Sequence, residues 1–335
     1  MKASLVSKVL IILCLLCLIT SFFTVDKHKP YIEETNNKKN FVSSTNKIAV
    51  IELDGPIASS SESGFFSKEA NATSMLKSIK NAREDKDING IILKINSPGG
   101  TVAMSQNIYN EIMKARKIKP VISVLDDVAA SGGYYIASAT DRIIAQDGTL
   151  TGSIGVIFSF MDYHNLLTNK LNIEQIVIKS GKYKDIGSSM REMLPEEKEL
   201  MQDIVDDSYQ QFLIAIREGR INRDKADYTV DKSVLTEDNL AKYADGRVFT
   251  GKKAKILGFV DINGDIETAK LIIEQMAQEK FKNKLKAKLV NYNRKNSFNE
   301  YFSSFTEYNP QGKIKITDIV PTSMILSRKP LYLWE

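Results

Sequence analysis

The chain has 335 residues, of which 43% are hydrophobic and 26% charged, so it can bury a sizeable core. Its formal net charge is +5, and the basic residues are scattered among acidic ones without interleaved aromatics, which argues against nucleic-acid binding. The only cysteines, Cys14 and Cys17, lie in the first apolar stretch, which excludes disulfides and a thiolate nucleophile elsewhere. The two histidines, His28 and His164, are too few for a zinc site, and we expect no metal or other cofactor.

The first predicted element is an apolar run near the N-terminus. Residues 9–25 carry no charge, and Lys2 and Lys8 precede them. This pattern is typical of a signal peptide or of a short transmembrane helix. Because the run is long for a signal peptide and the cleavage signal is poor, the sequence favours an uncleaved membrane anchor.

The orientation of this anchor follows from the flanking lysines. The two lysines before the run place residues 1–8 in the cytoplasm, whereas Lys27 and Lys29 beyond it oppose that orientation. Residues 26–46 are polar without a period, which is typical of a linker.

Beyond the linker, short apolar stretches alternate with amphipathic ones, which predicts an α/β domain with parallel strand pairing. The strands are apolar throughout, as expected when helices cover both faces of the sheet. We expect strands at 47–53, 88–95, 121–125, 142–145 and 173–178, and helices at 72–83, 101–116, from 131, 195–217, 251–257 and 266–278.

The helix over 195–217 is the longest of these. Pro195 suits its first position, and an apolar stripe along it predicts a core or subunit contact. The stripe consists of Met201, Ile204, Val205, Phe212 and Ile216.

Three glycine-bearing turns follow predicted strands, at residues 97–100, 130–133 and 151–155. In a parallel α/β sheet, the carboxyl ends of the strands form the ligand crevice. Glycines at such ends let the backbone approach a substrate and direct N–H groups at it. Each turn taken singly is more often a tight strand-to-helix connection.

Ser131 is the best nucleophile candidate, because it lies at a strand-to-helix junction among small neighbours. The N–H of Gly132 would point from the start of the helix toward an oxyanion, and Gly99 or Gly100 could supply a second donor. The alternative interpretation is that Ser131 only caps a helix.

A serine nucleophile needs a base. His164 lies in a polar segment without an obvious orienting carboxylate. The other candidates are Lys179, Lys182 and Lys184, and a lysine acts as a base only when it is held uncharged. On the residues alone, a surface lysine cluster is the better interpretation.

Several motifs taken together resemble one family. SPGG, ASGGYYIA, LTGSIGV and SGKYKDIGS followed by REMLPEEKELMQ, and later DGRVFTGKKAKILGFVD, occur in order from about Lys47 to Ala269. They resemble the signal peptide peptidase A family of bacterial serine proteases. The resemblance implies a ClpP/crotonase-like spiral of β-β-α units in a protease domain over 47–280. It also implies peptide substrates, chiefly released signal peptides.

The resemblance further implies homo-oligomers of ring or dome shape, anchored on the outer face of a lipid bilayer. By position, Ser131 is the nucleophile of a Ser-Lys dyad, Lys184 is the base, and Ser153 bonds the lysine. Gly132 and the Gly99–Gly100 turn match the oxyanion hole. The alternatives are a crotonase-like acyl-CoA enzyme, a related Ser-Lys protease that cuts intact membrane-protein segments, and a non-enzymatic scaffold.

Residues 281–335 form a basic C-terminal extension, longer than the resemblance leads us to expect. It ends in the apolar residues 330–334. Such an apolar segment either packs against the edge of the domain in an ordinary way, or it adds as a strand to a sheet edge near a substrate groove. The groove would belong to the same chain or to a neighbouring one.

Overall fold

The structure is a computed structural model that describes residues 45–59, 71–222, 228, 234–293 and 331–333. The expected anchor over 9–25, and the linker except for its last two residues, lie outside the described residues. No helix within these described ranges is both long and apolar enough to cross a membrane. The described elements all belong to the compact unit that begins at Ser43.

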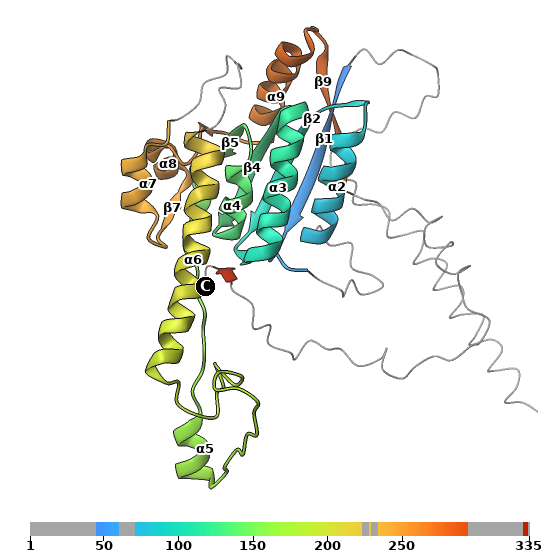
Figure 1. The fold of residues 1–335 in the computed structure, drawn as a ribbon. Helices are drawn as coiled ribbons and strands as arrows, with labels where there is room; N and C mark the ends of the chain where they lie inside the picture. The colour runs from blue at the N-terminus through green and yellow to red at the C-terminus, as the bar shows by residue number, and fades with distance from the viewer. Residues whose placement is uncertain (1–44, 60–70, 223–227, 229–233, 294–330, 334–335) are drawn as a thin grey trace, which may run out of the picture. The chain divides into compact units, whose positions relative to one another are not determined.

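Most predicted elements are confirmed, with boundaries within a few residues of the expectation, and several short ones are added (Figure 1). The strands are β1 (Thr45–Asp54), β2 (Ile88–Ser97), β3 (Gly99–Thr101), β4 (Val121–Ala130), β5 (Arg142–Ala145), β6 (Leu150–Gly152), β7 (Val248–Thr250), β8 (Ile262–Asn263), β9 (Lys286–Asn291) and β10 (Leu331–Leu333). The helices are α2 (Ala72–Glu84), α3 (Val102–Ile118), α4 (Gly132–Ser138), α5 (His164–Leu171), α6 (Pro195–Ile216), the π-helical turn η2 (Arg217–Ile221), α7 (Glu237–Tyr243), α8 (Gly251–Leu257) and α9 (Ile266–Phe281).

The main sheet has the strand order β7-β6-β4-β2-β1-β9, with β5 and β8 branching from β4. All of its strand pairs are parallel except β6 with β7. The expectation of parallel pairing is therefore confirmed. The sheet continues beyond residue 280, because β9 pairs with β1.

Helices cover both faces of the sheet, as the uninterrupted apolar strands predicted. Alternate strand residues such as Ile51 and Leu93 pack with α2, α3 and α4 in one cluster. The residues between them, such as Ile92 and Ile122, pack against α9 in a second cluster. Figure 1 shows α2 and α3 side by side across the first face. Hydrophobic burial on both faces makes the centre of the sheet a rigid platform for the turns at its edge.

The turns that carry the predicted site lie where β4 changes its partner. The first half of β4 pairs with β5, and its last residues pair with β6, so that Ala130 lies opposite Gly152. On the other side, Ser97 at the end of β2 lies opposite Ala129. The carboxyl ends of β2, β4 and β6 therefore meet, which is where a ligand crevice is expected in such a sheet.

The strand predicted over 173–178 is wrong. The chain from 172 to 179 forms no strand or helix, and Ile176 and Ile178 are 88% and 98% exposed. The segment has the apolar, β-prone composition of a strand, but the described chain supplies no neighbouring strand for it to pair with.

The long helix begins at Pro195, as predicted, but its stripe is only half buried. Phe212 and Ile216 pack in the core, whereas Ile204 near the other end is 43% exposed. The start of α6 belongs to a projection that we call the arm, residues 157–200. Only Gly187 and Glu197 are buried within it. Figure 1 shows α5 at the end of the arm, separated from α4 by much of the length of α6.

Candidate active site

Ser131 occupies a strained junction between β4 and α4. Its φ of 52° and ψ of −116° lie outside the regions that non-glycine residues ordinarily adopt, which costs about 1–3 kcal/mol. Its N–H donates to the carbonyl oxygen of Gly152 at 2.8 Å, and its own carbonyl accepts from the N–H of Tyr135 at 2.8 Å. The backbone is therefore fixed on both sides. The sequence prediction of a sharp, serine-bearing turn is confirmed.

The hydroxyl of Ser131 is the exceptional feature of this turn. The residue is fully buried, yet its Oγ has no hydrogen-bond partner among the described residues. Ser131 stands at the N-cap position of α4, but its hydroxyl accepts no bond from that helix, so the side chain does not serve as a cap. A buried hydroxyl without a partner costs about 1–3 kcal/mol and calls for a functional reason.

Glycines bring a second backbone segment against this turn. A Cβ on Gly132 would lie 2.7 Å from Oγ of Ser105 and 3.2 Å from the N atom of Gly100. A Cβ on Gly100 would lie 2.0 Å from the carbonyl oxygen of Ile57. Any side chain at either position would force these segments apart. The three predicted oxyanion-hole residues, Gly99, Gly100 and Gly132, therefore lie together.

The donors in this group are not equivalent. The N–H of Gly99 already donates to Oγ of Ser97 at 3.2 Å. The carbonyl of Gly99 and the N–H of Thr101 both bond Ile57 at 2.7 Å. Because successive peptide groups of a strand face opposite sides, the N–H of Gly100 faces away from Ile57. Gly132 is the first residue of α4, so its N–H has no acceptor within the helix. The N–H of Gly132 is thus an available donor, the N–H of Gly100 lies on the outer edge of β3, and the N–H of Gly99 is already engaged.

Ser97 was missed by the sequence reasoning. It is fully buried, its hydroxyl holds the Gly99 N–H, and its carbonyl lies where Gly133 has no room for a Cβ, at 2.9 Å. A serine two residues before a glycine is a local side-chain-to-backbone turn pattern, and that signal could have identified it.

Ser153 lies beside Ser131 at the end of the next strand. It is 6% exposed, has a φ of 49°, and its N–H donates to the carbonyl oxygen of Arg247 at 2.8 Å. Among the described residues, the other non-glycine positions with positive φ, Asn172 and Lys282, are ordinary left-handed helix ends. The two strained serines are thus both predicted site residues.

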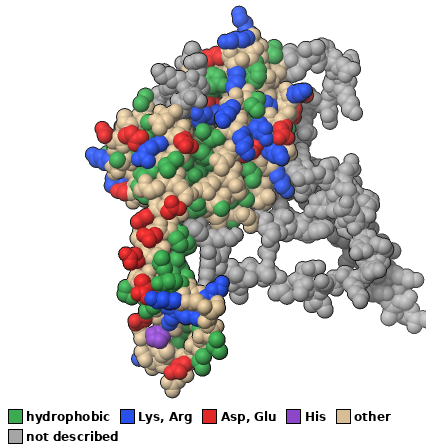
Figure 2. Space-filling model, viewed as in Figure 1, with side chains coloured by type: hydrophobic (Ala, Val, Ile, Leu, Met, Phe, Trp, Pro, Cys, Tyr) green, Lys and Arg blue, Asp and Glu red, His purple; other side chains and the backbone are tan. Residues whose placement is uncertain are grey.

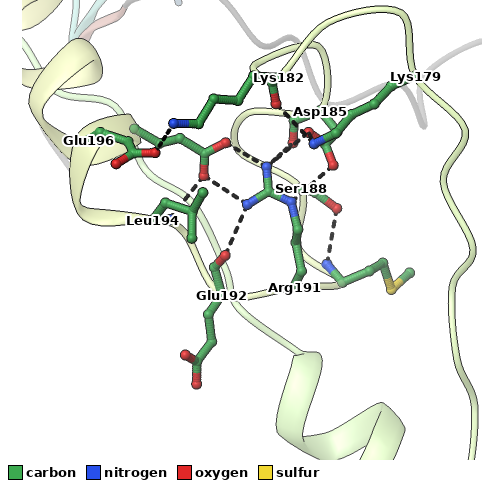
Figure 3. Close-up of polar contacts among 10 residues, drawn as sticks. Lys179, Lys182, Asp185, Ser188, Arg191, Glu192, Leu194 and Glu196 are labelled. Carbon is green, nitrogen blue, oxygen red and sulfur yellow. Dashed lines mark hydrogen bonds and ion pairs between the residues drawn. The ribbon is translucent and has the colours of Figure 1, made fainter.

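Lys184 does not lie with these groups in the same chain. It is exposed in the arm, and its side chain makes no hydrogen bond or ion pair with any described residue. Its neighbours differ: Lys179 pairs with Asp185 at 2.5 Å, and Lys182 pairs with Glu196 (Figure 3). His164 is also in the arm, where its Nδ1 lies 3.1 Å from the carbonyl oxygen of Met190.

The end of the described chain lies against the glycine turn. Strand β10 pairs antiparallel with β3, with Tyr332 opposite Gly100 and Leu333 opposite Gly99, and it also contacts α4. The sheet-edge alternative predicted for the C-terminal extension is therefore confirmed for residues 331–333. An extended segment occupies the edge that carries the Gly100 N–H.

Comparison with known proteins identifies the family. A model of peptidase family S49 matches residues 113–280, and a model of the Clp protease family matches residues 64–145. A putative protease from Synechocystis sp. is 39% identical over 228 residues, which cover 68% of this chain and 73% of the relative. The chain belongs to peptidase family S49.

Two further relatives are also similar to this S49 peptidase over most of its length. The putative signal peptide peptidase SppA of Enterococcus faecium is 36% identical over 71% of this chain and 64% of its own length. Protease 4 of Salmonella typhi is 32% identical over 70% of this chain but only 35% of its own length. The S49 peptidase is a serine protease with a ClpP-like α/β fold.

Proposed function

We propose that this S49 peptidase hydrolyses extended peptides with Ser131 as the nucleophile and Lys184 of a second copy of the chain as the general base. The observation that carries the proposal is the buried, unpartnered hydroxyl of Ser131, which lies beside Gly132 at the start of α4 and beside the edge of β3 that carries the Gly100 N–H. A hydroxyl in this setting lacks only a base to become a nucleophile.

In the proposed reaction, Oγ of Ser131 attacks the peptide carbonyl while the uncharged amine of Lys184 takes the hydroxyl proton. The oxyanion of the tetrahedral intermediate accepts hydrogen bonds from Gly100 and Gly132. The protonated amine then gives its proton to the leaving nitrogen, and an acyl-enzyme remains. Water, deprotonated by the same amine, attacks the acyl-enzyme; the ester bond to Oγ breaks, Oγ takes back the proton from the amine, and the second product leaves. In this proposal Ser153 bonds the lysine amine, as the resemblance implied.

A second copy is invoked because the two dyad residues belong to different regions of one chain. Lys184 is the one cation of residues 179–197, all of them described, that pairs with no anion. The same arm exposes apolar side chains, among them Ile176 and Ile178. Figure 2 shows apolar side chains beside charged ones on this projection. Burying them against a partner stabilises an assembly by about 25 cal/mol per Å². We therefore propose a homo-oligomer in which the arm of one copy reaches the Ser131 of another, within the spiral of β-β-α units expected for the fold.

The proposed substrates follow from the edge of β3. Residues 331–333, which are Leu-Tyr-Leu, lie there as an antiparallel strand, so we infer that substrates bind in the same extended form. Released signal peptides are apolar and suit this edge, and one relative is named as a putative signal peptide peptidase. An anchor over residues 9–25 would hold the catalytic domain beside such substrates on the outer face of a membrane. A preference for intact membrane-protein segments would instead appear in substrate profiling.

The test is hydrolysis of apolar peptides by the full chain in detergent, together with labelling by a fluorophosphonate probe. We expect Ser131→Ala to lose both labelling and hydrolysis, and Lys184→Ala to lose hydrolysis, each by about 10⁴-fold or more. Activity should rise toward alkaline pH, because a lysine base must be uncharged. Labelling at another serine would refute the nucleophile. An active Lys184→Ala variant would move the base role to Lys182 or His164.

A further inference from the structure

Arg191 is the centre of an ionic cluster in the arm (Figure 3). Its Nε and Nη2 donate to the two oxygens of Asp185, each at 2.9 Å. Its Nη1 and Nη2 donate to the two oxygens of Glu197 at 2.7 and 2.6 Å. A guanidinium that is bidentate to two carboxylates fixes both in geometry as well as in charge.

The cluster joins the loop of the proposed base to a helix end. Asp185 directly follows Lys184, and Glu197 lies in the first turn of α6. Glu197 is fully buried and also accepts from the N–H of Leu194 at 2.9 Å, which caps α6. Through Arg191, the position of the Lys184 backbone is therefore tied to a rigid helix rather than to an exposed loop.

The same contacts decide which carboxylates remain free to pair with Lys184. Arg191, and after it Lys179, hold the pKa of Asp185 below its usual range, and Arg191 likewise lowers the pKa of Glu197. Both groups are thus ionised and already paired. An unpaired carboxylate next to Lys184 would favour its ammonium form and disable it as a base.

Three other charged groups near this loop do not join the cluster. Lys182 pairs with Glu196, and the side chain of Glu192 points away from the cluster in Figure 3. The charged and titratable groups of the loop, the start of α6 and α5 are Lys179, Lys182, Tyr183, Lys184, Asp185, Arg191, Glu192, Glu196, Glu197, Lys198, Glu199, His164 and Lys170.

We propose that Arg191 is a positioning residue for the base. It holds the Lys184 loop on α6, and it neutralises the Asp185 carboxylate so that the neighbouring amine stays available in its uncharged form. This inference rests on the proposed function, because it concerns the lysine assigned there as the base.

The experiment is the pH dependence of kcat and kcat/KM for the full chain, between about pH 6 and pH 10. In Arg191→Gln, Asp185 keeps its charge and loses its main partner, so its carboxylate favours the ammonium form of Lys184. The part of the pH–activity profile that rises with pH, here called the rising limb, therefore moves to higher pH. Activity near pH 7 falls about threefold to tenfold and recovers at alkaline pH. Asp185→Asn removes the carboxylate and moves the limb to lower pH. The double variant returns the limb close to that of the unmodified protein.

Two further variants separate charge from geometry. Arg191→Lys keeps the positive charge but loses the bidentate fork, so it should lower kcat while leaving the limb in place. Arg217→Gln removes a comparable arginine pair with Glu237 outside the arm, so it should change neither kcat nor the pH of the rising limb.

An equal loss at every pH in Arg191→Gln, with the limb unmoved, would show a structural role only and overturn the inference. If Arg191→Gln fails to fold, an unmoved limb in Asp185→Asn overturns it in the same way. These outcomes differ from failure of the proposed function, in which Lys184→Ala stays active or the unmodified protein shows no rising limb.

Discussion

The two halves of the proposed dyad lie in opposite environments. Ser131 is buried, strained and fixed at both backbone ends in the body of the molecule. Lys184 is exposed in the arm, and ionic contacts rather than apolar packing hold its loop. The surroundings of Ser131 are therefore completed by the fold of the chain itself, whereas the arm presents the unpaired amine of Lys184 outward.

This difference explains why the Ser131 half-site tolerates an unfavourable arrangement. A strained φ and an unpartnered hydroxyl persist only where the surroundings over-determine the backbone. Here β2, β3 and α4 do so through contacts that only glycine permits. The arm has almost no buried apolar side chains, so the arm is suited to be ordered by a partner.

The rigidity of the Ser131 half-site depends on Ser97, and its removal is the largest effect we expect outside the dyad. Ser97→Ala frees the Gly99 N–H, which lets the Gly100 N–H leave the oxyanion position. We expect kcat to fall about 10- to 100-fold with KM little changed, measured by steady-state kinetics.

Ser78→Ala is the matched control, because Ser78 is also buried but its Oγ bonds nothing in the described structure. It should leave kcat unchanged. If both variants behave alike, or if Ser97→Ala raises KM alone, the glycine turn does not depend on the Ser97 hydroxyl. The Ser131 half-site would then be less rigid than this comparison with the arm supposes.

A smaller effect should follow from the C-terminal strand, which contacts β3 and α4. If β10 occupies the edge that substrates use, removing residues 331–335 should lower KM about twofold to fivefold and leave kcat unchanged. Peptide titration of both chains measures this. A higher KM or a lower kcat would mean that the strand supports the site instead of competing for it.

The sequence predicted the body well because its signals are local. Each glycine turn directly follows an apolar strand, and the junction at Ser131 is evident from its small neighbours. The uninterrupted apolar strands also predicted the helices on both faces. The role of Ser97 and the exclusion of Gly99 as a donor depend on how three turns meet in space, which spacing alone does not give.

The arm was predicted poorly because its partners are distant or outside the chain. An apolar run over 173–178 indicates a strand, but strands need a neighbour, and none is present among the described residues. Lys184 was distinguished from Lys179 and Lys182 only through the family resemblance. The ion pairs that engage the other two lysines come from residues up to fourteen positions away, such as Glu196.

The most direct test mixes two inactive variants, Ser131→Ala and Lys184→Ala, and lets them assemble together before peptide hydrolysis is measured. If the dyad forms between copies, a Lys184→Ala chain contributes its serine and a Ser131→Ala chain contributes its lysine. Random pairing then restores about one quarter of the unmodified activity. A mixture that assembles and remains inactive would contradict the account, because each site would then need both residues from one chain.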